Sequence, residues 1–128
     1  MRTLIGAAIA AALLTTPTLA NEPYGTWETK KDASGAYLHV KVEPCPDDEK
    51  LLCANVVKTF ETPHTEIVGR KIFWDLETED GQNWSGGQVW DAATDKTYDA
   101  KVILGKTRLR VEGCVSLFCE GQNWTRVE

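Results

Sequence analysis

Hydrophobic and polar residues alternate along most of this chain, in short stretches separated by turn-forming residues. The clearest stretch runs from Tyr37 to Glu43, where Leu38, Val40 and Val42 fall on one face and three polar residues fall on the other. A period of two residues is typical of a β-strand with one buried face. The pattern therefore predicts short strands and little helix.

Eight such stretches follow one another, and Gly, Pro, Asp and Asn separate most of them. Sequential antiparallel strands of this number either stack as a sandwich or close as an up-and-down barrel. Closure leaves no edge strand exposed, and an eight-stranded barrel has a lumen that is filled or holds one small ligand. The predicted strands are Gly25–Lys31, Tyr37–Glu43, Leu51–Lys58, Ile67–Leu76, Trp84–Asp91, Thr97–Leu104, Thr107–Cys114 and Cys119–Val127.

The first twenty residues have a different pattern. Arg2 precedes an apolar run from Leu4 to Leu14, and Thr18-Leu19-Ala20 offers small residues for cleavage. This arrangement is typical of a secretory signal peptide. We therefore predict cleavage near Ala20, a mature domain of residues 21–128 and a periplasmic or secreted location. A membrane-spanning helix needs roughly 20 apolar residues, so we predict no membrane span.

The mature chain is acidic and short. Without Arg2 it carries 13 basic and 19 acidic residues, a formal net charge of −6. An acidic surface disfavours nucleic acid as a partner. The remaining length supports one domain with a modest core.

Four cysteines remain after the predicted cleavage, and four cysteines allow three pairings. Export favours disulfides over a metal site, and the spacings C-x7-C and C-x4-C fit zinc poorly. We predict the two local pairs, Cys45–Cys53 and Cys114–Cys119. Each closes a short loop and stabilises the fold by roughly 2–3 kcal/mol.

Two short stretches have more than one interpretation. Gly86-Gly87 lies inside a predicted strand, where glycine marks a bulge or bend, or leaves space for a ligand. Leu117-Phe118 lies between two paired cysteines, so we expect it at a hairpin tip. An apolar tip is either a surface for a protein partner or homodimer, or a cover for an open barrel end.

The tryptophan content is high for a domain of this size, with five residues. Indole rings either fill a barrel or line its pocket, since pockets for small molecules are mostly apolar and aromatic. Trp84 and Trp90 are six positions apart on one predicted strand, so we expect both to face the lumen. The candidate ligand-binding residues are Trp74, Trp84, Trp90, Tyr98, Arg108 and Arg110, with the arginines near a rim.

Catalytic chemistry has little support in the sequence. The two histidines, His39 and His64, have no pattern of partners that predicts a metal site or proton transfer. Asp75 and Glu77 share a face, but solvated strand carboxylates account for them. We predict no catalytic residue, no metal and no cofactor.

Several motifs together carry a family resemblance. The segments W-S-G-G-Q-V-W-D from Trp84, K-T-Y from Lys96, L-R-V-E-G-C from Leu109 and W-T-R-V from Trp124 resemble the pattern of the domain of unknown function 2147 family. The resemblance spans essentially the whole mature chain. Ala54 and Asp95 depart from it, each where the family often has glycine.

The resemblance implies a small exported bacterial protein with a lipocalin-like (calycin-type) eight-stranded antiparallel barrel and no established reaction. The early Gly25-Thr26-Trp27 also resembles lipocalins, where this tryptophan packs at the closed barrel end against a late basic residue. By that likeness Trp27 packs near Arg126 in a structural cation–π contact. Trp124, Gly86 and Gly87 are likewise expected to be structural.

Two functions are therefore in competition. The first is binding of a small apolar or amphipathic ligand in an aromatic-lined barrel, with an arginine or tyrosine holding a polar end. The alternative is an envelope interaction module, or an inhibitor of an exported enzyme, with a filled barrel and Leu117-Phe118 as its contact.

Overall fold

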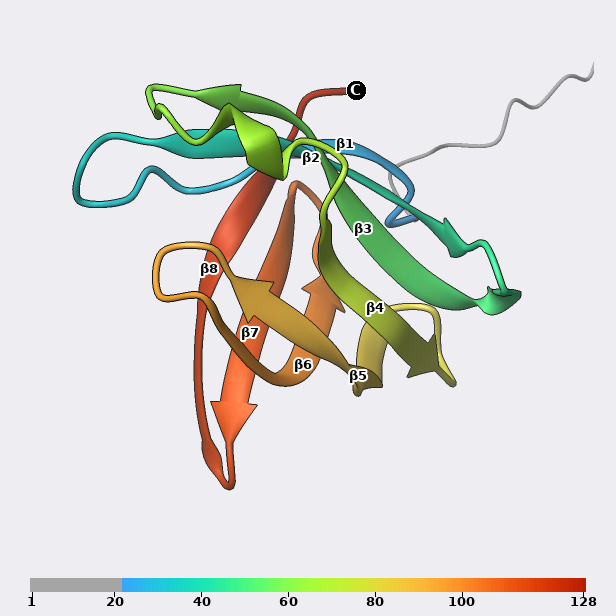
Figure 1. The fold of residues 1–128 in the computed structure, drawn as a ribbon. Coiled ribbons are helices and arrows are strands. Elements are labelled where there is room, and N and C mark those ends of the chain that lie inside the picture. Colours follow the sequence, from blue (N-terminus) through green and yellow to red (C-terminus); the bar gives the residue numbers. More distant parts are fainter. Residues whose placement is uncertain (1–21) are drawn as a thin grey trace, which may run out of the picture.

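The computed structural model describes residues 22–128, so the predicted signal peptide lies outside the described residues. Residues 22–128 form eight strands and one short 3-10 helix, η2 (Thr65–Ile67) (Figure 1). Within the described range no helix is long and apolar enough to cross a membrane. The strands are β1 (Gly25–Glu28), β2 (Tyr37–Cys45), β3 (Asp48–Phe60), β4 (Lys71–Thr78), β5 (Asn83–Asp91), β6 (Lys96–Leu104), β7 (Arg108–Val115) and β8 (Phe118–Arg126).

The strands form a closed barrel in sequence order. Each strand pairs antiparallel with the next, and β1 closes the ring by pairing Trp27 with Arg126 and Glu28 with Thr125 of β8. The predicted eight-stranded antiparallel up-and-down barrel is confirmed.

Because every connection is a hairpin, successive connections alternate between the two ends of the barrel. We call the end with residues 29–36, 61–70, 92–95 and 116–117 the open end. The opposite end has the other three connections, and β1 begins and β8 finishes there; we call it the closed end.

The core follows the predicted alternation on β2, where Val40 and Val42 are fully buried. β4 differs from the prediction that Ile72, Trp74 and Leu76 share one face. Ile72 and Leu76 are buried as expected, but Phe73 between them is fully buried as well, paired with both neighbouring strands, and Trp74 is partly exposed.

Irregular pairing explains this difference on β4. The β3–β4 register shifts between rungs, and Asp75 has a positive φ of 59°. An extra residue in one strand reverses which side chains point inward beyond it. The core itself is continuous around the barrel. Its fully buried larger side chains are Trp27, Phe73, Leu52, Leu76, Leu109, Val40, Val42, Val56 and Val102.

The boundary between β3 and β4 also differs from the sequence prediction. β3 extends to Phe60, and β4 begins only at Lys71, because Ile67 belongs to η2 and residues 68–69 form a turn. This connection stays attached to β3, since the N–H of Gly69 donates to the carbonyl of Val56 and the N–H of Val56 donates to that of Arg70.

Both predicted disulfides are present. Cys45–Cys53 joins β2 to β3, and Cys114–Cys119 joins directly paired residues of β7 and β8. Each therefore closes a hairpin at its turn. The first lies toward the closed end and the second toward the open end.

Candidate ligand-binding cleft

The closed end is filled by an arginine–tryptophan pair. Trp27 is 1% exposed, and the Arg126 guanidinium carbon lies 4.3 Å from its ring centroid. The indole Nε1 donates to the Pro23 carbonyl at 2.8 Å. Arg126 donates to the carbonyls of Tyr24 and Glu22 at 2.8 and 2.6 Å. The predicted Trp27–Arg126 contact is confirmed, and it ties the first described residues to the last strand.

The open end contains a large cleft of about 1250 Å³. Apolar side chains from several strands meet in its lining, and we call them its floor. They are the buried Ile72, Val89, Val111 and Trp124 and the partly buried Leu38. Tyr98 of β6 lines the same cleft and packs against the core. Three open-end connections, residues 29–36, 61–70 and 92–95, supply its walls, and Val115 and Phe118 beside the fourth connection complete them. Pockets for drug-sized molecules measure about 300–1,000 Å³, so this cleft is large enough to hold one.

Charged side chains surround the cleft, and most of them are acidic. Lys30 and Arg70 are its only lysine and arginine among the residues that the structure describes. The Asp32 carboxylate is held in place by the Ser34 hydroxyl at 2.6 Å, which with nearby backbone N–H groups lowers the pKa of Asp32. The lining carboxylates are those of Asp32, Glu61, Glu66, Asp91, Asp95, Glu112 and Glu120.

A second arginine–tryptophan pair lies at the cleft. The Arg70 guanidinium carbon lies 3.5 Å from the Trp90 ring centroid. Trp90 Nε1 donates to the Asp95 carboxylate at 2.8 Å, and Arg70 lies 3.7 Å from the same carboxylate. These contacts join the β3–β4 connection to the β5–β6 connection. Sequence reasoning did not identify Arg70 or its pairing with Trp90.

Gln122 links the β1–β2 connection, which forms one wall of the cleft, to Trp124 on the floor. Its side-chain oxygen accepts hydrogen bonds from the Lys30 N–H at 3.1 Å and from Trp124 Nε1 at 2.9 Å. The glutamine thereby satisfies the buried indole N–H of the floor and holds the β1–β2 connection beside β8. This role was also absent from the sequence predictions.

The two candidate tryptophans of β5 do not share a face. Trp84 pairs with Val102 and Trp90 pairs with Thr97, five positions apart on β6. Residues an odd number apart point to opposite faces of a strand. A register shift between Ser85 and Gln88 causes this, so the expectation that both face the lumen is wrong. Both rings are buried, but only Trp90 lines the cleft.

The structure separates the six candidate ligand-binding residues. Tyr98 and Trp90 line the cleft, whereas Trp84 lies in the core outside its lining. Arg108 and Arg110 alternate with the buried Leu109 and Val111 and point outward, so they are not at the cleft rim as expected. Arg110 instead donates to the Glu112 carboxylate at 2.7 Å. The sixth candidate, Trp74, lines a different groove.

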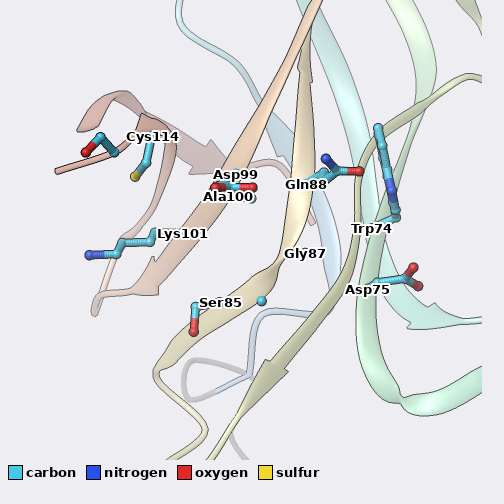
Figure 2. Close-up of a pocket in the computed structure, with 11 residues that line it drawn as sticks. Trp74, Asp75, Ser85, Gly87, Gln88, Asp99, Ala100, Lys101 and Cys114 are labelled. Atoms are coloured by element: carbon cyan, nitrogen blue, oxygen red, sulfur yellow. The ribbon is translucent and has the colours of Figure 1, made fainter. Parts of the chain in front are cut away.

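That second groove measures about 600 Å³ and lies over β4, β5 and β6 (Figure 2). Trp74 and Asp75 lie on one side of it and Lys101 on the other, with Gly87 between them (Figure 2). A side chain at Gly87 would place its Cβ 1.9 Å from the Trp74 carbonyl oxygen. Close backbone approach therefore requires glycine here, and Gly86 has a φ of +88°, which glycine adopts without strain. These contacts support the bulge interpretation of Gly86-Gly87.

The β7–β8 hairpin extends beyond the rest of the barrel (Figure 1). At its tip Leu117 is 93% exposed, Phe118 is 82% exposed and Val115 is 61% exposed. Val115 and Phe118 pair with each other and also line the cleft. The tip is therefore a projecting apolar arm beside the opening.

Other titratable groups are tied to local partners. His39 contacts Glu28 at 3.0 Å on the barrel wall, and His64 lies 3.5 Å from Glu66 in an exposed connection. Within residues 22–128, each group with metal-ligand atoms close together contains both cysteines of one disulfide. Their sulfurs are already bonded to each other.

Comparison with known proteins is consistent with this architecture. A solved structure described as "Protein HP1028 from the human pathogen Helicobacter pylori belongs to the lipocalin family" matches with a TM-score of 0.66 and 14% sequence identity. The match covers 84% of this chain and 84% of that chain. At this identity the likeness concerns the fold alone. No curated protein matches the chain.

The family model of DUF2147, described as "Uncharacterized protein conserved in bacteria", matches residues 25–126. The matched range begins with β1 and ends with the last residue of β8, so it contains the whole barrel. The resemblance noted in the sequence is thereby confirmed, and the chain belongs to the DUF2147 family.

Proposed function

We propose that this protein is exported and binds one small, partly apolar ligand in the cleft at the open end of its barrel. The observation that carries the proposal is the combination of an apolar floor with a cleft of about 1250 Å³. Binding would transfer the apolar part of the ligand from water onto Trp124, Val111 and their neighbours. Burial of apolar area is the main source of affinity in such sites.

The charges of the rim restrict the polar part of the ligand. Acidic side chains outnumber basic ones around the opening, and Arg70 is engaged with Trp90 and Asp95. The rim carboxylates would repel a negatively charged ligand group at short range and weaken its binding. A neutral or positively charged polar group therefore fits the rim better than an anionic one. This replaces the expectation that Arg108 or Arg110 holds the polar end.

Export is supported by the signal-peptide pattern of residues 1–20 and by the two disulfides, which form in oxidising compartments. The proposed function needs no catalytic step. It requires only that the opening admits the ligand and that the closed end remains filled.

The test uses the full chain expressed through the periplasm. Native and denaturing mass spectra of the purified protein are compared. A stoichiometric extra mass that disappears on denaturation is the expected result, and it gives the ligand's molecular weight. The neutral probe N-phenyl-1-naphthylamine and the anionic 8-anilinonaphthalene-1-sulfonate are then titrated. We expect the neutral probe to bind about tenfold more tightly, a difference of about 1.4 kcal/mol.

Matched variants locate the binding site. Val111→Phe places extra volume on the cleft floor, whereas Ile103→Phe adds the same group on the exposed outer face of β6. We expect the first variant to lose the extra mass and probe binding and the second to keep both. Near-ultraviolet circular dichroism checks that each variant is folded. Equal probe binding by the two folded variants would contradict the proposal.

The alternative function, an interaction module, is favoured by one observation, the exposed Leu117 and Phe118 at the hairpin tip. It requires no ligand. A bare mass in the native spectrum, together with no saturable probe binding by the wild-type chain, would favour it over ligand binding.

A further inference from the structure

The β7–β8 hairpin tip consists of uncharged residues only. Gly113 to Cys119 is a run of seven residues without a charge, and Leu117 and Phe118 are its most exposed members. Monomeric proteins rarely leave large apolar side chains clustered and exposed without a contact that covers them. The tip is also pre-organised, because Cys114–Cys119 joins its two strands directly behind the turn.

The shape of the tip limits what it can contact. Val115 and Phe118 face each other across the hairpin, and Ser116 and Leu117 form the two-residue turn. A stable protein interface buries about 800 Å² on each partner and uses 20–30 residues. Three apolar side chains on a narrow projecting arm provide only a small part of that area. Insertion into a lipid layer needs only a few apolar side chains and no matching pocket.

The charges nearest the tip are acidic. Glu112 and Glu120 flank the uncharged run, and each pairs with a glycine of the opposite strand. Arg110 neutralises Glu112 through its 2.7 Å contact. No lysine or arginine lies in the run or next to it in the sequence. In space, Lys101 of β6 lines the same groove as Cys114 and Ser116, together with the acidic Asp99. Membrane-binding segments that depend on anionic lipids have clusters of lysine and arginine. The tip therefore matches a zwitterionic lipid surface.

From these observations we propose that the tip of the β7–β8 hairpin inserts Leu117 and Phe118 into a zwitterionic lipid surface. Val115 and Phe118 also line the cleft, so docking by the tip brings the opening to that surface. This arrangement deepens the proposed function and rests on it in one respect: it would let a partly apolar ligand pass between the lipid layer and the cleft. Docking itself needs no bound ligand.

The test is flotation of the full mature chain with vesicles of dioleoylphosphatidylcholine and dioleoylphosphatidylethanolamine. We expect the wild-type chain to float with the vesicles and the double variant Leu117→Ser/Phe118→Ser to lose at least tenfold in partition coefficient. The control Val57→Ser/Ile103→Ser removes exposed apolar side chains from the barrel wall and should leave flotation unchanged. Equal losses in the two double variants would overturn the proposal.

A second measurement reports insertion directly. Leu117→Trp places a fluorophore at the apex, and its emission should shift to the blue with vesicles and be quenched by brominated lipids. Thirty per cent phosphatidylglycerol should weaken binding at low salt, and added salt should restore it, because the repulsion by Glu120 is screened. Stronger binding to anionic vesicles would overturn the proposal.

The same variants show whether the tip contacts a lipid surface or a second copy of the chain. If the wild-type chain fails to float and forms dimers that the Leu117→Ser/Phe118→Ser variant does not, the tip is a contact between two copies and the lipid proposal is wrong. If it fails to float and is monomeric, the proposal is equally wrong. Val111→Phe distinguishes docking from ligand binding, because it should float normally while binding no probe.

Discussion

The two ends of the barrel each contain an arginine over a tryptophan, but the contacts around the two pairs differ. At the closed end, Arg126 and Trp27 are hydrogen-bonded to main-chain carbonyls. At the open end, Arg70 and Trp90 share the carboxylate of one exposed residue, Asp95. Three main-chain carbonyls of residues 22–24, just before β1, hold the closed-end pair together. A single exposed carboxylate on a loop, as at the open end, can turn away at low cost. The comparison indicates that the Arg126–Trp27 pair is fixed at the closed end, whereas the Arg70–Trp90 pair at the open end can rearrange.

The largest expected effect comes from removing the tryptophan of the closed-end pair. Trp27→Ala removes a fully buried indole and leaves a cavity under Arg126. We expect the free energy of unfolding to fall by about 3–5 kcal/mol, measured by chemical denaturation. Trp90→Ala at the open end should lower it by less, because the ring borders a cleft that water already reaches. Equal losses of unfolding free energy would show that the two pairs stabilise the fold equally, and would contradict the comparison.

The next effect concerns the bulge of β5 at Gly86-Gly87, where the β5–β6 register shifts. Gly87→Ala would place a Cβ against the main chain at Trp74, so we expect a loss of about 2–3 kcal/mol in unfolding free energy. Gly81→Ala is the comparison variant, because its Cβ would meet nothing within 4 Å and its only strain would come from a positive φ, which Gly87 does not have. A loss in Gly87→Ala no larger than that in Gly81→Ala would contradict the importance of close approach.

The two arginines provide a smaller and more direct comparison. Lysine keeps the charge but loses the planar group that stacks on indole and donates to two carbonyls. Arg126→Lys should therefore lower the unfolding free energy by about 1–2 kcal/mol. Arg70→Lys should change it by less than about 0.5 kcal/mol and alter probe affinity instead. Thermal melting and probe titration together check the pair.

The smallest effect concerns acid. Hydrogen bonds from the Asn83 side chain, and then from backbone N–H groups of residues 82 and 83, lower the pKa of Asp80 in the turn at the closed end. A carboxylate with a depressed folded-state pKa stabilises the fold above its unfolded pKa of about 3.9, and this contribution is lost as pH falls further. Asp80→Asn should therefore flatten the dependence of melting temperature on pH below about 4. An unchanged pH profile in the variant would contradict this assignment.

Much of the fold could be predicted because strand alternation and turn residues are local signals. The eight strands, the local disulfides and the Trp27–Arg126 contact followed from such signals or from the family resemblance. Bulges were not predictable in the same way. The shift near Gly86-Gly87 reverses the facing of Trp90 relative to Trp84, and it depends on a close approach of another strand.

The candidate site was only partly visible in the sequence for the same reason. Tyr98 could be assigned to the cleft because the alternation of its strand is regular. Arg70 lies in a connection without alternation, and Gln122 sits on a strand where its partner, Lys30, is 92 positions away. Such contacts arise only when the loops of the open end meet.

The contact between the residues before β1 and the end of β8 has a kinetic consequence. Glu22 and Tyr24 are held by Arg126, more than a hundred positions later in the chain. Contacts at such separation form late, because the intervening chain must first be ordered. Hairpins such as β7–β8, which have short loops, are expected to form early, and the β1–β8 seam last. Barrel closure should therefore be the slow step of refolding, and a truncation before Arg126 should leave collapsed hairpins that do not close into a ring.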